Sequence, residues 1–296
     1  METANKGYNL SIPVNNFNLS YDDLGKGDIP IIFLHGFPFD KQMWKSQLEF
    51  LSDTYRVIAC DVRGFGKSSD EETNLSIDLF GSDLIYFMDT LGFQRAVVCG
   101  LSMGGYIALN AQARFPERFE AMILADTRCI YDSNEVKDKR MEVIKKIEAE
   151  GPNEFNEAFV KSVFHKDSLA EKKALVQELK DVVFGNSERI ITEGLRALSG
   201  RSETCSSLAN VEIPTLIICG KEDTVTPLDQ SKTMHEAIEG SMLHIIEKAG
   251  HVSNLEQLEA FNSILKEFLS GLPLDGSDEE SPKKALDSEY YGHKSQ

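Results

Sequence analysis

The chain has 296 residues, of which 41% are hydrophobic, and its 48 acidic and 31 basic residues give a net charge of −17. This length and composition fit a globular protein with a sizeable core and exclude a minimal scaffold stapled by disulfides. A negative field of this size repels phosphate backbones and anionic membrane surfaces, so we expect no nucleic-acid partner.

The N-terminal segment contains no secretion signal, and the longest apolar runs fall far short of the ~20 residues that cross a bilayer. We therefore expect a cytoplasmic protein without a membrane segment. Residues 8–12 and 17–21 predict a β-hairpin. Five later apolar runs do not alternate with polar residues, which is typical of strands covered on both faces by helices. These runs are 31–34, 57–60, 96–99, 122–125 and 216–219.

Helical periodicity separates the apolar runs, notably over residues 76–91, 102–115 and 255–269. Strand and helix therefore alternate along most of the chain. This alternation predicts an α/β fold with a mostly parallel central sheet and helices on both of its faces.

Residues 129–205 break the alternation, because they contain no strand-like run and repeat their apolar residues at helical spacing. We predict that this segment is a cap of four helices inserted into a core of residues 1–128 and 206–270. Residues 271–296 are polar, and from Asp275 on they hold six acids and three bases, which leaves −14 for the rest of the chain. We predict an acidic, disordered tail.

The five cysteines are odd in number and scattered, with no spacing of the kind that binds metals. We predict reduced thiols, as in a cytosolic protein, and no metal site. The cysteines are Cys60, Cys99, Cys129, Cys205 and Cys219.

The sequence Gly100-Leu101-Ser102-Met103-Gly104 directly follows a predicted strand and begins a predicted helix. A sharp connection of this kind exposes a nucleophilic serine, and its glycines let the strand and helix backbones pass close together. Ser102 is therefore the candidate nucleophile. The alternative is a serine that caps an ordinary helix.

A serine hydroxyl needs a base that takes its proton and an acid that orients the base. His251 follows a predicted strand on a loop, where α/β sheets gather functional groups, and it is the candidate base. Asp223 also follows a strand and is the candidate acid. Asp126, at another strand end, is its competitor, and Glu222 ranks below both because it neighbours the better-placed Asp223.

Attack on a carbonyl creates an oxyanion, which must be met by preorganised hydrogen-bond donors. The backbone N–H of Met103, at the start of a helix, supplies one donor. We expect the second from the N–H of Phe37, in the loop after strand 31–34, where the alternative is merely a tight turn with Gly36 at positive φ. This chemistry requires no metal and no organic cofactor.

Taken together, five motifs over about residues 8–270 resemble the α/β-hydrolase superfamily. The motifs are His35-Gly36, Asp61-Val62-Arg63-Gly64-Phe65-Gly66-Lys67-Ser68, Gly100 to Gly105, Gly220…Asp223…Pro227 and Ala249-Gly250-His251. The resemblance implies an α/β-hydrolase fold with a Ser-Asp-His triad in that chain order. It also implies structural roles for Asp61 and Arg63.

The cap and the segment Leu124 to Arg128 look most like the cap-bearing esterase and lactonase branch, which includes 3-oxoadipate enol-lactonases and cofactor-free perhydrolases. Serine at position 102 disfavours the alkyl-enzyme chemistry of dehalogenases and epoxide hydrolases, which use an aspartate there. The substrate of an enol-lactonase is anionic, so a body of −14 would slow its approach unless the cap presents a local basic patch.

The sequence thus predicts a serine hydrolase that cleaves small-molecule carboxylic esters or lactones through Ser102, Asp223 and His251, with Phe37 and Met103 as oxyanion donors. Two alternatives stay open: an acyltransferase or perhydrolase on the same triad, and a non-catalytic ligand-binding protein on the same scaffold. Aromatic residues of the cap and its surroundings are candidates for the pocket wall. They are Phe37, Trp44, Phe155, Phe159 and Phe164. No particular oligomeric state is predicted.

Overall fold

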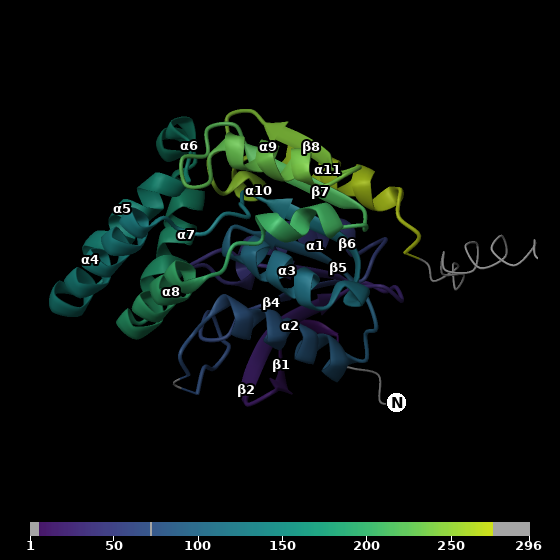
Figure 1. Cartoon of the computed structure of the whole chain (residues 1–296), viewed down its shortest axis with the longest axis horizontal. Helices are drawn as coiled ribbons and strands as arrows, with labels where there is room; N and C mark the ends of the chain where they lie inside the picture. Colours follow the sequence, from purple (N-terminus) through teal and green to yellow (C-terminus); the bar gives the residue numbers. More distant parts are fainter. Residues whose placement is uncertain (1–5, 72, 275–296) are drawn as a thin grey trace, which may run out of the picture.

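A central sheet of eight strands, in the order β1-β2-β4-β3-β5-β6-β7-β8, organises the computed structural model, which describes residues 6–71 and 73–274 (Figure 1). β1 and β2 form the predicted hairpin, β2 runs antiparallel to β4, and the remaining neighbours are parallel. The strands are β1 Gly7–Val14, β2 Phe17–Leu24, β3 Ile31–Leu34, β4 Val57–Cys60, β5 Ala96–Leu101, β6 Phe119–Ala125, β7 Thr215–Gly220 and β8 Met242–Ile246.

Helices cover both faces of the sheet, and each face has its own apolar core. In β3, for example, Ile32 and Leu34 enter the core beneath α2, α3 and α9, whereas Ile31 and Phe33 enter the core beneath α1 and α11. Burial on both sides explains why the strands are continuous apolar runs. The helices outside the insertion are α1 Lys45–Leu51, α2 Ile77–Leu91, α3 Met103–Arg114, α9 Leu228–Ala237, α10 Ser253–Glu256 and α11 Leu258–Ser270.

Five further helices lie between β6 and β7 in the chain and together to one side of the sheet (Figure 1, teal to green). They are α4 Asn134–Glu150, α5 Asn153–Val163, α6 Lys166–Glu171, α7 Lys173–Gly185 and α8 Glu188–Gly200. The prediction of four helices was wrong by one. The residues taken as a break, 166–168, begin the short helix α6, in which only Ser168 is buried, too little apolar burial to give a periodic signal.

The α/β-hydrolase fold class and its helical insertion are confirmed, while the exact division into core and cap stays a prediction. The predicted disordered tail lies almost wholly outside the described residues. No helix within the described ranges has an apolar stretch long enough to cross a bilayer.

Two cysteines form a disulfide, Cys129–Cys205, with a Cα–Cα distance of 4.8 Å. The prediction of five reduced thiols is therefore wrong for this pair, although Cys60, Cys99 and Cys219 are free and buried. The error arose because the partners are 76 residues apart, and only the fold brings the two ends of the helical insertion together.

Candidate active site

Ser102 stands on a sharp turn between β5 and α3, with φ 54° and ψ −110°. The turn is anchored to the neighbouring strand, because the Ser102 N–H donates to the carbonyl of Ala125 at the end of β6 (2.9 Å). The flanking glycines are required by space. A Cβ at Gly100 would lie 2.2 Å from the Gly104 carbonyl group, and one at Gly104 would lie 2.2 Å from the Leu34 oxygen. The strained conformation is thus built in by close packing of β3, β5 and α3.

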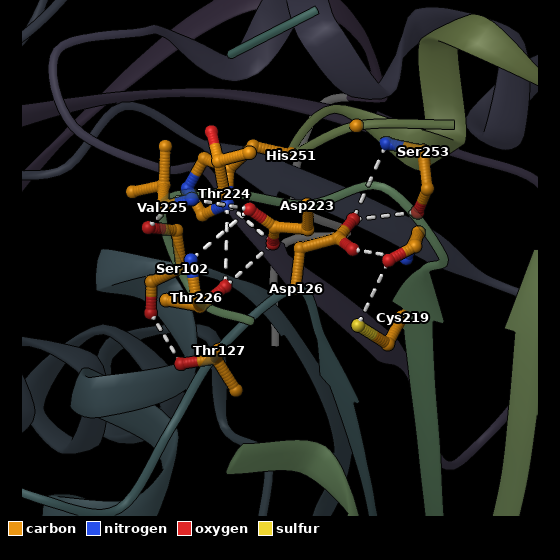
Figure 2. A network of polar contacts seen from close by, with 12 residues as sticks. Ser102, Asp126, Thr127, Cys219, Asp223, Thr224, Val225, Thr226, His251 and Ser253 are labelled. Carbon is orange, nitrogen blue, oxygen red and sulfur yellow. Dashed lines mark hydrogen bonds and ion pairs between the residues drawn. The ribbon is translucent and has the colours of Figure 1, made fainter. Parts of the chain in front are cut away.

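The three predicted side chains form one hydrogen-bonded chain (Figure 2). The Ser102 hydroxyl lies 2.8 Å from Nε2 of His251, and Nδ1 of His251 lies 2.8 Å from Oδ2 of Asp223. Ser102 is only 8% exposed and the other two less. They come from loops after β5, β7 and β8, whose carboxyl ends share one edge of the sheet because these strands are parallel.

The charges and hydrogen bonds of Asp223 and His251 shift each other's pKa. Burial by itself would raise the pKa of Asp223, but the charge and hydrogen bond of His251 and the bonds from Thr226 outweigh it and lower the pKa. Burial would likewise lower the pKa of His251, but the charge and hydrogen bond of Asp223 raise it above the ordinary value. The ion pair is therefore stabilised when His251 takes a proton.

Asp126 is the other candidate for the acid that orients His251. Among the described residues, no hydrogen bond joins Asp126 to His251. Its carboxylate accepts from the Gly220 N–H (2.7 Å) and from the Ser253 hydroxyl (2.5 Å). Burial, followed by repulsion from Asp223, raises the pKa of Asp126 to about 7. Asp126 thus lies beside Asp223 and ties the ends of β6 and β7 to the segment after β8 (Figure 2).

Asp126, Cys219 and Asp223 bring their potential ligand atoms within 4.8 Å of one another. The carboxylates already accept hydrogen bonds from Gly220, Ser253, Thr226 and His251. Burial raises the pKa of the Cys219 thiol, so this sulfur is not a thiolate at neutral pH. This cluster is therefore occupied by internal hydrogen bonds and is poorly suited to a cation.

The two predicted oxyanion donors are the backbone N–H groups of Met103, next to Ser102 in the chain, and of Phe37, which lines the same cavity as Ser102. Met103 is the first residue of α3, so its N–H has no acceptor within the helix. The Phe39 N–H closes the neighbouring turn on Gly36 O (2.9 Å), whereas the Phe37 N–H donates to no acceptor in the described parts of the chain. Both N–H groups are thus available to a ligand.

A cavity of about 200 Å³ opens onto Ser102 and His251. Three predicted aromatic residues, Phe37, Phe155 and Phe159, line it. Trp44 instead packs on Phe33 and Phe261, and Phe164 is buried in one of the two cores. The complete lining is Phe37, Ser102, Tyr106, Arg128, Arg140, Phe155, Phe159, Ser162, Leu195, Leu198, Val225 and His251.

Sequence reasoning missed the residues that hold the site in place. Glu256 is buried and accepts from the N–H groups of Gly250 (2.6 Å) and His165 (2.7 Å), which joins the His251 loop to the helical insertion. His165 itself is buried, as the N-cap residue of α6. Thr226 donates to Asp223 (2.6 Å). In the sequence, a threonine three residues after a candidate acid could have indicated this hydrogen bond, whereas nothing in the sequence around Glu256 indicated its contacts.

The expected structural residues have structural contacts. Asp61 is buried and accepts from the backbone and side chain of Lys41 (2.8 and 2.9 Å). Arg63 forms a two-bond ion pair with Asp83, both bonds 2.7 Å long, and stacks on Phe17. Neither pair lines the cavity that opens onto Ser102.

The fold and this serine turn are those of a hydrolase with an α/β architecture. The family model described as alpha/beta hydrolase fold matches residues 29–258, and the chain belongs to the α/β-hydrolase family.

Three relatives illustrate the range of activities. The 3-oxoadipate enol-lactonase 2 of Acinetobacter baylyi is 30% identical over 258 residues, covering 84% of this chain and 94% of that protein. A thermophilic esterase from Thermogutta terrifontis superposes with a TM-score of 0.84 at 28% identity, covering 88% of this chain and 98% of its own. A bromoperoxidase from Bacillus anthracis superposes with a TM-score of 0.80 at 27% identity, covering 88% of this chain and 100% of its own.

Proposed function

We propose that the protein is a serine hydrolase that cleaves small carboxylic esters or lactones. The observation that carries the proposal is the continuous hydrogen-bonded chain from Ser102 through His251 to Asp223 at the floor of a cavity. The cavity of about 200 Å³ is smaller than the ~300–1,000 Å³ of drug-sized sites, which favours a small substrate. The similarity to an esterase and an enol-lactonase supports the same class.

In the proposed reaction the Ser102 oxygen attacks the carbonyl carbon while Nε2 of His251 accepts the hydroxyl proton. Asp223 holds the proton on Nδ1 of His251, so that Nε2 is free to act as the base, and stabilises the imidazolium that forms. The N–H groups of Phe37 and Met103 stabilise the oxyanion. His251 then protonates the leaving alcohol, and a water that it activates cleaves the acyl-enzyme.

The test uses the purified protein and its Ser102→Ala variant. We expect a fluorophosphonate probe to label the native protein and not the variant, and 4-nitrophenyl esters to be hydrolysed by the native protein alone. The side chain of Ser102 is small and its removal leaves the turn's backbone bonds intact, so thermal unfolding should be unchanged. A folded native protein that neither reacts with the probe nor turns over any ester would favour the non-catalytic alternative.

Acyl transfer to peroxide is the second candidate, favoured by the similarity to a bromoperoxidase. It needs the same triad and differs only in the acceptor that attacks the acyl-enzyme. Product analysis with acetate esters and hydrogen peroxide separates the two, because peracid in excess of free acid would identify a perhydrolase.

The cytoplasmic location stays a prediction, and the Cys129–Cys205 disulfide argues against it. Disulfides persist chiefly in oxidising compartments. Trapping of free thiols in fresh cell extracts would decide whether this pair is oxidised where the protein resides.

A further inference from the structure

The two edges of the sheet differ in how they are protected from pairing with another strand. β1 and β8 lie at opposite ends of the sheet (Figure 1). β1 contains Pro13, which has no N–H to donate, and Asn9 at φ 54°, and its register with β2 shifts between Gly7 and Leu10. Proline and bulges are among the devices by which proteins block edge strands. The β1 edge is therefore poorly suited to accept a further strand.

β8 has no such protection. Its five residues, Met242–Ile246, include no proline, no glycine and no acidic residue, lysine or arginine. Its pairing with β7 runs without a register shift, and β7 is the one strand that pairs with it among the described residues. Met242 is 38% exposed and Ile245 is 42% exposed. An uncharged, apolar edge strand of this kind is a template for pairing with another strand.

The outer side of β8 presents the backbone groups of alternate residues. The N–H of Lys221, just after β7, donates to the Ile246 carbonyl (2.9 Å), so the backbone groups of Ile246 point toward β7. Successive residues of a strand point their N–H and C=O groups to opposite sides, so those of Leu243 and Ile245 point away from β7. Among the described strands none lies on that side. The N–H and the carbonyl of both residues therefore face an incoming strand.

A second copy of β8 satisfies these groups when it pairs antiparallel about His244. Leu243 then lies opposite Ile245 of the partner subunit, and the two residues exchange both of their backbone hydrogen bonds. The same exchange joins Ile245 to Leu243 of the partner subunit, so no outward group of either strand is left over. The arrangement is self-complementary, because a two-fold axis through His244 gives both copies the same contacts.

The side chains of the two strands match as well. Leu243 packs on the core beneath α2, α3 and α9, whereas Ile246 belongs to the core beneath α1 and α11. Alternation therefore places Ile245 on the first face and Met242 on the second. In the antiparallel pair, Ile245 lies beside Leu243 of the partner subunit, and Met242 lies beside Ile246 of the partner subunit. These apolar cross-strand pairs cover the two exposed side chains and stabilise the contact.

Charge does not oppose this contact, although the whole chain carries −17. Around the carboxyl end of β8 lie Lys221, Glu222, Glu247 and Lys248, whose charges cancel. Antiparallel pairing places this neutral end beside the amino end of the partner's strand, which Glu239 precedes. Parallel pairing would instead place Glu239 near its own copy, and like charges repel. Charge therefore favours the antiparallel arrangement.

We propose that β8 is an interface between two copies of this chain, which pair antiparallel through Met242–Ile246 and join their sheets into one continuous sheet. The carboxyl edges of the two sheets then point in opposite directions. None of the residues of β8 lines the cavity at Ser102, so the interface does not depend on the proposed hydrolysis. Because a five-residue strand makes a small interface, we expect a dimer that dissociates in the micromolar range.

Analytical ultracentrifugation tests the association. With rising concentration the native protein should shift from the 33.1 kDa of one chain to twice that mass. Ile245→Lys places a charge on the edge strand, the device by which many proteins block such edges, and both copies lose an apolar pair. The variant should therefore weaken the dimer at least about tenfold. Since Ile245 is exposed, its thermal unfolding as a monomer should be unchanged.

Phe50→Lys is the matched control. Phe50 is 44% exposed on α1, next to Glu49, which contacts Tyr8 of β1 at the opposite edge (3.5 Å). This variant introduces the same charge and should leave the association unchanged. A native protein that stays monomeric at high micromolar concentration would leave the edge to a strand of another protein and would overturn the proposal. A dimer that Ile245→Lys does not weaken would overturn it as well.

An engineered disulfide tests the register. His244 lies on the two-fold axis, where the Cα atoms of a non-hydrogen-bonded antiparallel pair are about 4.5 Å apart, within the span of a disulfide. His244→Cys should therefore give a covalent dimer under a mild oxidant, to which each thiol gives up a proton and an electron. Met242→Cys lies about 14 Å from its own copy and should give none. Cys60, Cys99 and Cys219 are buried and do not compete. No cross-link at position 244, or an equal one at position 242, would show that the strands do not pair in this way.

Discussion

The carboxyl edge of the sheet and the helical insertion, referred to below as the cap, are specified in different ways. At the edge, Ser102, Asp223 and His251 each lie within five residues of a strand's end, and parallel strands bring their carboxyl ends together. In the cap, Phe155 and Phe159 line the cavity where α5 packs against Phe37, more than a hundred residues earlier in the chain. The edge thus depends on short-range geometry, whereas the wall of the cavity depends on packing between distant parts of the chain.

The sharpest test of the edge compares its two buried acids. Asp223→Asn should reduce kcat about 10⁴-fold, because an amide in place of the carboxylate favours the wrong tautomer of His251. Asp126→Asn removes the same charge from the neighbouring strand end and should cost less than about tenfold. Steady-state kinetics on one ester measures both, and comparable losses in the two variants would mean that the acid's role has been misassigned.

The same contrast explains how much of the molecule is predictable from its sequence. The central strands β3 to β7 were identifiable because they are buried on both faces. The serine turn was identifiable because Gly100 and Gly104 have no room for a side chain. The disulfide and the role of Glu256 were not identifiable. Cys129 and Cys205 are 76 residues apart, and Glu256 accepts from the N–H of His165, 91 positions away, so only the folded chain brings these partners together.

Removal of the disulfide that joins the two ends of the cap should have the next largest effect, on the stability of the protein. Cys129 and Cys205 close a 76-residue span at the two ends of the cap, so Cys129→Ser with Cys205→Ser should lower the free energy of unfolding by about 2–4 kcal/mol. Urea unfolding followed by circular dichroism measures this loss.

Dithiothreitol provides the control for that measurement, since it should destabilise the native protein and leave the double variant unchanged. Thiol titration of the denatured, unreduced protein should find three thiols, from Cys60, Cys99 and Cys219. Five thiols would show that the cap is held by packing alone.

A smaller effect is expected where cap and edge meet. Glu256→Gln keeps the size of the side chain but leaves one of the two N–H groups, of Gly250 or His165, facing an amide donor. We expect a loss of about 1–3 kcal/mol in unfolding free energy and a lower kcat, because the His251 loop is freed. Glu259→Gln, exposed on α11, is the control. A destabilised variant with full kcat would show that the cap does not position His251.

The smallest effect concerns pH. Because Asp223, and to a lesser extent Asp126, raises the pKa of His251, and the neutral imidazole is the base, kcat/KM should rise with pH through a value above 6.5. The pKa of Asp126, about 7, lies close to this value, so the acid limb of the native protein should be broader than that of a single proton.

Asp126→Asn removes a charge that favours protonated His251. The limb should therefore move to lower pH by less than about one unit and steepen to a single-proton form. Asp53→Asn, an exposed acid on a distant loop, should leave the profile unchanged. A shift to higher pH in Asp126→Asn would mean that Asp126 acts on His251 through geometry rather than charge, because loss of its bonds to Gly220 and Ser253 would then be the dominant change.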